Sequence, residues 1–133
     1  MSISTTRRTV AAMAAGRVVI GAAAVLVPGP GSRLLGFPPE QDSPAARLSG
    51  RLFGVRDVAL GALVWRTRDE PSLARYVYRL NAWVDAGDAT AMAVAVIGRQ
   101  GIDRAAVSSA ALALTGAAGW LNLLRLTGGC SDA

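Results

Sequence analysis

The stretch LARYVYRLNAWVDAGDATAMAVAVI, residues 73–97, decides the fold that this sequence predicts. It is mostly apolar and longer than the roughly 20 residues that a helix needs to cross a membrane. Helical spacing places Asn81, Asp85 and Asp88 on one face near its middle. Charge at membrane depth is costly and normally faces other helices, so this face is expected to line a site.

Three further segments are also of membrane-spanning length, and polar residues interrupt their apolar runs in the same way. They cover residues 9–27, 44–65 and 105–126, and each carries polar or charged side chains near its middle. Residues 28–31, Pro-Gly-Pro-Gly, end the first segment, and the later connections are short, which favours antiparallel neighbours. We therefore predict an all-α fold for residues 1–133, as one integral membrane domain that forms a four-helix transmembrane bundle with up-down topology.

The composition agrees with a membrane protein. Hydrophobic residues make up 52% of the chain and charged residues 17%, below the roughly 25% that is typical of soluble domains. The net charge of +5 comes from arginines scattered between apolar runs, so we expect no nucleic-acid partner. The chain contains no His and a single Cys, and we therefore predict no metal site and no cofactor.

The distribution of arginines predicts the orientation. Arg7 and Arg8 precede the first segment, and Arg66, Arg68 and Arg75 flank the connection between the second and third segments. Up-down topology puts both groups on the same side of the membrane and leaves fewer arginines on the other. The positive-inside rule then predicts a multi-pass protein of the cell inner membrane with both termini in the cytoplasm.

A cleaved export signal is the alternative for the first segment. Arg7 and Arg8 ahead of an apolar run resemble a twin-arginine signal. However, Arg17 interrupts the run, and the rest of the chain is as apolar as a membrane protein. We therefore predict that this segment remains in the protein as a membrane helix.

The charged residues of three segments fall at similar predicted depth, and we expect them to form one buried site. Two carboxylates one turn apart in a low dielectric disfavour simultaneous ionisation unless cations compensate them. The alternative is a structural ion-pair network that only fixes helix register. The candidate catalytic residues are Asp57, Asp85 and Asp88, and the candidate ligand-binding residues are Arg17, Arg56, Asn81 and Thr115.

A stripe of small residues runs along the second segment. Gly50, Gly54, Asp57 and Gly61 share one face, and Gly50 and Gly54 form a G-x-x-x-G pair that permits close approach of another helix. A homo-oligomer through the Gly50/Gly54 face is one candidate use of this stripe, and a packing seam is the other. Arg56 points to roughly the opposite side, so it must meet a different neighbour or reach water.

The fourth segment carries a polar stripe without charge. Ser108, Thr115 and Asn122 lie seven residues apart on one face. Apart from the ligand-binding candidacy of Thr115, we expect these side chains to form hydrogen bonds to neighbouring helices.

A family resemblance rests on two phrases and on the four-helix layout. The phrases Gly54-Val-Arg56-Asp57-Val-Ala-Leu-Gly61 and Asp85-Ala-Gly-Asp88 resemble small bacterial integral membrane proteins of unknown function, the DoxX-like group. The resemblance covers most of the chain. It implies a four-helix membrane fold and no established catalytic residue, so no residue's role is transferred from it.

Three functions are compatible with the sequence. The leading hypothesis is a small polytopic membrane protein whose buried Arg/Asp site near the bilayer midplane binds a lipophilic or small polar ligand, with the lipid bilayer and a hydrophobic small molecule as partners. The second is a membrane enzyme that uses a buried Asp as general acid to isomerise or cyclise a hydrophobic substrate. The third is a non-catalytic subunit of a membrane assembly.

Overall fold

The computed structural model describes residues 3–128. This part of the chain is helical and contains no strand, so the expectation of an all-α fold is confirmed. A short helix α2 (Pro28–Leu34) and a 3-10 turn η1 (Pro39–Gln41) lie in the first connection. The four long helices are α1 (Ile3–Leu26), α3 (Pro44–Thr67), α4 (Pro71–Ile97) and α5 (Asp103–Gly128).

Proline and capping residues set several helix boundaries. Residues 28–31 do end α1, but they then begin α2, because proline suits the first helical turn, where its missing N–H is not needed. Pro44 opens α3 in the same way, and the Ser43 hydroxyl accepts a hydrogen bond from the Ala46 N–H at 3.2 Å. Just before this cap, hydrogen bonds from Arg47 lower the pKa of the Asp42 carboxyl.

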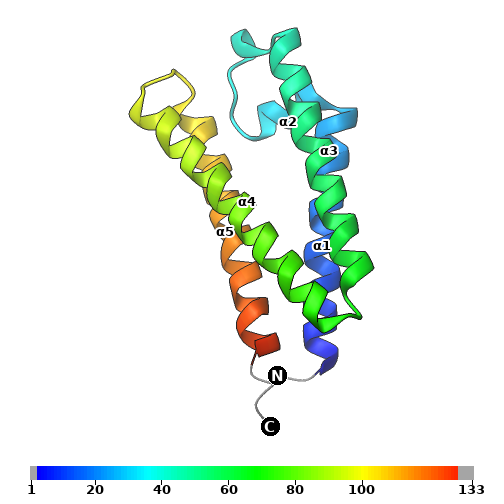
Figure 1. The fold of residues 1–133 in the computed structure, drawn as a ribbon. Coiled ribbons are helices and arrows are strands. Elements are labelled where there is room, and N and C mark those ends of the chain that lie inside the picture. The colour runs from blue at the N-terminus through cyan, green and yellow to red at the C-terminus, as the bar shows by residue number, and fades with distance from the viewer. Residues whose placement is uncertain (1–2, 129–133) are drawn as a thin grey trace.

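The long helices form two pairs. α1 packs chiefly against α3, and α4 packs against α5 (Figure 1). Consecutive long helices run in opposite directions, and the two pairs diverge toward the α4–α5 connection (Figure 1). All four helices contribute to one buried apolar cluster, which lies in the half that carries the termini. Its members are Val10, Ala14, Val64, Ala74, Val77, Tyr78, Ala82, Trp120 and Leu123.

The glycine stripe of α3 faces α1 within the same chain. A Cβ added at Gly54 would lie 2.5 Å from the carbonyl oxygen of Gly21, and one added at Gly61 would lie 2.9 Å from that of Ala14. At Gly50 the nearest atom is the Pro28 Cβ, at 4.0 Å. The stripe is therefore a packing seam along most of its length. A homo-oligomer through this face stays a prediction, but α1 already covers the Gly54 part of it.

The outer surface of the long helices is apolar. Near the middle of each helix a large apolar side chain is exposed: Val19 at 66%, Val55 at 58%, Trp83 at 79% and Leu114 at 58%. Charged side chains at the same level face inward, as described below. This arrangement reverses that of a soluble protein, in which extended exposed apolar surface is rare.

Two helices are long and apolar enough to cross a membrane by themselves. Among the described residues these spans are Thr5–Leu26 and Asp103–Gly128. α3 and α4 have 24 and 27 residues, but charged side chains in their interiors reduce their apolar character. Two of the four expected spans therefore meet the criterion on length and composition.

We predict that Gly54→Ala destabilises the protein and that Gly16→Ala does not. The new methyl group at residue 54 overlaps the backbone of α1, and such overpacking costs about 1–3 kcal/mol. At Gly16 a Cβ meets nothing within 4 Å, and alanine favours a helix by about 1 kcal/mol over glycine. Thermal unfolding of the purified variants, followed by circular dichroism, measures the difference. Equal melting temperatures would refute the close seam.

Candidate functional site

Arg17 of α1 joins the two helix pairs through two carboxylates. Its Nη1 donates a hydrogen bond to Oδ1 of Asp57 on α3 at 3.0 Å, and its Nη2 donates to Oδ1 of Asp85 on α4. All three side chains are 8% exposed. A guanidinium presents several donors in a rigid planar fork, so one arginine can hold two carboxylates in fixed positions.

Asp85 extends this arrangement to the fourth long helix. Its second oxygen, Oδ2, accepts a hydrogen bond from the indole Nε1–H of Trp120 on α5 at 3.0 Å. The Arg17 guanidinium also lies 5.8 Å from the centre of the Trp120 ring, which favours the cation. Gly116, one turn before Trp120, leaves the space for the carboxylate, since a Cβ there would lie 2.5 Å from Asp85 Oδ2.

A second arginine pairs with the remaining aspartate at the side of this centre. Arg56 donates two hydrogen bonds to Asp88, from Nη1 to Oδ1 at 3.0 Å and from Nη2 to Oδ2 at 2.7 Å. Its Nη2 also lies 3.6 Å from Asp57 Oδ1, so both arginines belong to one network. The Arg56 side chain is 38% exposed and that of Asp88 is 26% exposed. The network is therefore buried at Arg17 and partly open at Arg56.

The charges of this network do not balance. Two guanidiniums face three carboxylates, so the fully ionised network carries one excess negative charge. Each carboxylate contacts an arginine, but in a low dielectric the uncompensated negative charge is costly, and it favours binding of a proton or of a cationic or hydrogen-bond-donating group. This imbalance is the chemical property that distinguishes the network from a closed set of ion pairs.

The structure brings together five of the seven residues predicted for the site: Arg17, Arg56, Asp57, Asp85 and Asp88. Asn81 is fully buried one turn before Asp85. Its Nδ2 donates to the Val77 carbonyl at 2.9 Å, and its Oδ1 has no hydrogen-bond partner. Thr115 does not join the network, because it is exposed and its hydroxyl donates to the Ala111 carbonyl of its own helix at 2.8 Å.

Of the other two polar residues in the stripe of α5, one contacts another element and one is exposed. Ser108 donates a hydrogen bond to the Leu35 carbonyl, so it links α5 to the residue that follows α2. Asn122 is exposed.

The residues that sequence reasoning missed are Trp120 and Gly116. The sequence pattern that could have identified them is a tryptophan one helical turn after a glycine, at the same expected depth as the aspartates. A glycine leaves space for a carboxylate, and the indole N–H of the tryptophan can donate a hydrogen bond to it.

The network contains no obvious metal site. Within residues 3–128, no group of three His, Cys, Asp or Glu side chains lies close enough to hold a metal ion. The arginines already bind the carboxylates, most clearly at Asp88, where the contact is bidentate, and this leaves too few free oxygen ligands for a metal ion. Each carboxylate oxygen can still accept one further hydrogen bond. What the arrangement offers chemically is hydrogen bonding, ion pairing and one carboxylate in excess.

We predict that Arg17→Gln destabilises the fold far more than Arg56→Gln. The first substitution leaves Asp57 and Asp85 buried without their central cation, and breaking a buried pair from one side costs about 3–5 kcal/mol. Arg56 lies at the edge of the network and is 38% exposed, and its loss leaves the Arg17 contacts with Asp57 and Asp85 in place, so the second loss is expected to be smaller. Chemical unfolding of both purified variants measures the two free energies. Similar losses would contradict the central position of Arg17.

Comparisons with known proteins assign neither a family nor a function to the chain. The chain matches no protein-family model, no curated protein and no solved structure.

Proposed function

We propose that the chain is a small multi-pass protein of the inner membrane in which all four long helices span the bilayer. Each has 24 to 27 residues, more than the roughly 20 that a span requires. The mid-helix charges of α3 and α4 are paired inside the network, which reduces the cost of holding them at bilayer depth. The exposed apolar surface of the long helices supports this placement.

The same proposal places both termini in the cytoplasm. Among the described residues outside the network, the half of the structure that carries the termini holds seven arginines, and the other half holds five. The positive-inside rule then favours the half with the termini as the cytoplasmic side.

Within this frame the Arg/Asp network binds a lipophilic ligand whose polar end carries a cation or a hydroxyl or amine donor. The excess carboxylate carries this proposal, because it creates a demand for one more positive or proton-donating group. The partly exposed Arg56–Asp88 pair is the point of access, since its side chains are reachable without opening the buried centre. A small molecule that dissolves in the bilayer reaches this depth directly.

The second candidate function is an enzyme that uses the same network as its active site. This candidate requires that a proton neutralises the excess negative charge when no cationic ligand is present, because a protonated aspartate can act as general acid toward a hydrophobic substrate. Isomerisation or cyclisation of such a substrate requires no cofactor. This candidate differs from the first in one observable, which is turnover of the bound molecule.

We predict that the protein stays in the membrane fraction after extraction at alkaline pH. We also expect a fluorescent reporter fused after α5 to be active in the cytoplasm, and a periplasmic phosphatase inserted in the α4–α5 connection to be active outside. Release of the chain by alkali would contradict membrane integration. Sequencing of the mature N-terminus tests the signal-peptide alternative, because loss of residues 1–31 would remove Arg17 from the network.

We predict that a small molecule co-purifies with the wild-type protein and is lost from Asp88→Asn. This variant removes the accessible carboxylate and leaves the Arg17 contacts in place, so it is expected to fold. Mass spectrometry of extracts from the purified proteins measures the retained species. Addition of that species to the wild type, with analysis for products, then separates binding from catalysis.

The matched control is Asp103→Asn, which removes the same charge from an exposed position in the first turn of α5. It should retain the species as the wild type does. Identical profiles for all three proteins would contradict a ligand site at the network and would favour the assembly-subunit function.

A further inference from the structure

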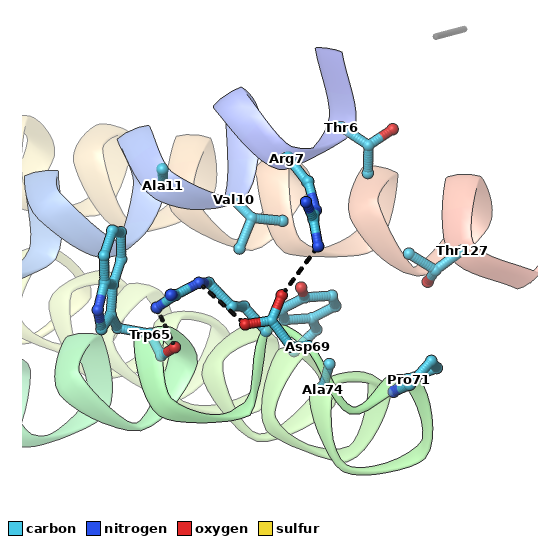
Figure 2. A pocket seen from close by; sticks show the side chains of 11 residues that line it. Thr6, Arg7, Val10, Ala11, Trp65, Asp69, Pro71, Ala74 and Thr127 are labelled. Carbon is cyan, nitrogen blue, oxygen red and sulfur yellow. Dashed lines mark hydrogen bonds and ion pairs between the residues drawn. The ribbon is translucent and has the colours of Figure 1, made fainter. Parts of the chain in front are cut away.

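A pocket of about 420 Å³ lies at the end of the molecule that carries the termini. It is separate from the Arg/Asp network and is lined by residues of all four long helices and of the α3–α4 connection (Figure 2). Its volume falls within the range of roughly 300–1,000 Å³ that is usual for small-molecule sites. The apolar part of the lining consists of Val10, Ala11, Trp65, Pro71, Ala74 and the Tyr78 ring.

The rim of this pocket carries two arginines and one carboxylate. Arg7 Nη2 lies 3.1 Å from Asp69 Oδ1, and Arg68 Nε lies 3.4 Å from Asp69 Oδ2. Figure 2 shows Arg7 reaching from α1 toward Asp69. Because two guanidiniums share one carboxylate, the rim keeps one positive charge. The Arg7–Asp69 pair is 76% and 60% exposed, and exposed pairs are weak, so an incoming anion can replace this contact.

Arg68 is held in position for such an anion. Its guanidinium lies 4.0 Å from the centre of the Trp65 ring, and its Nη1 donates a hydrogen bond to the Trp65 carbonyl at 2.8 Å. Both contacts restrict the side chain at the edge of the apolar lining. An arginine fixed by stacking loses less conformational freedom when it binds a phosphate than a free one does.

We propose that this pocket binds an anionic phospholipid, with its phosphate at Arg7 and Arg68 and part of an acyl chain on the apolar lining. The proposal rests on the proposed membrane location, which places this end of the molecule at the cytoplasmic leaflet. Basic pockets between membrane helices on that side suit anionic lipid headgroups. The apolar lining separates a lipid from a free phosphate ion, which has no use for it.

Native mass spectrometry of the full-length protein in a neutral detergent tests this site. Phosphatidylglycerol and phosphatidylcholine are titrated separately, and we expect tighter binding of the first. Each of Arg7→Gln and Arg68→Gln should weaken phosphatidylglycerol binding about fivefold, which corresponds to about 1 kcal/mol per arginine near anionic lipid. Arg99→Gln, a charge-matched change at the opposite end of the molecule, should leave the binding unchanged.

A second pair of variants tests the apolar part without a change of charge. Ala11→Phe places a ring in the pocket and should reduce phosphatidylglycerol binding. Ala12→Phe adds the same ring at the neighbouring exposed position, outside the lining, and should not. Equal effects of the two substitutions, or equal affinity for the two lipids, would overturn the proposal.

Competition with inorganic phosphate distinguishes a phospholipid headgroup from a free phosphate ion as the anion that binds. We expect millimolar phosphate to leave bound phosphatidylglycerol in place, and full displacement would overturn the lipid assignment in favour of a simple anion site. Asp88→Asn should bind phosphatidylglycerol normally, because Asp88 lies outside this pocket. Failure of the lipid site is therefore distinguishable from failure of the ligand site at the network.

Discussion

The interaction on which the structure depends is the contact of one buried guanidinium, that of Arg17, with Asp57 and Asp85. An arginine and two aspartates at 8% exposure are tolerable only when their donors and acceptors are matched. This requirement fixes the positions of α1, α3 and α4 relative to one another. It extends to α5 because the Trp120 indole satisfies the second oxygen of Asp85.

The rest of the fold is arranged around this contact. The glycine stripe brings α3 close enough to α1 for Arg17 to reach Asp57, and Gly116 clears space on α5 for Asp85. The apolar cluster closes the half of the molecule that carries the termini, and the network follows it along the helices, since Arg17 and Asp85 come one turn after the cluster members Ala14 and Ala82. The helix pairs diverge toward the α4–α5 connection (Figure 1). Apolar side chains occupy the outside at the same depth. Mid-helix charges that face inward and apolar side chains that face outward are the features on which the proposed membrane location and ligand site rest.

Sequence reasoning located the long helices and most of the polar centre, because apolar length and helical spacing are local properties. α1 begins at Ile3 rather than near residue 9, and α2 was not expected, since residues 28–31 can both end one helix and begin the next. Arg56 was expected to meet a different neighbour from the stripe of Asp57 or to reach water, and it does contact a different helix, at Asp88 on α4. Thr115 shared the stripe of Ser108, but helix packing left it outside the network.

Trp120 was missed because pattern analysis counts it as apolar, whereas its N–H is the hydrogen-bond donor that Asp85 Oδ2 requires. These pairings depend on which helices are neighbours, and spacing along a single helix does not contain that information.

A double-mutant cycle between Arg17 and Asp85 tests the central contact most directly. The free energies of unfolding are measured for the wild type, Arg17→Gln, Asp85→Asn and the double variant. If the two side chains form the buried ion pair, the double variant loses less stability than the sum of the single losses, by about 0.5–3 kcal/mol. Strictly additive losses would contradict the account, because they would mean that Arg17 and Asp85 do not interact in the folded protein.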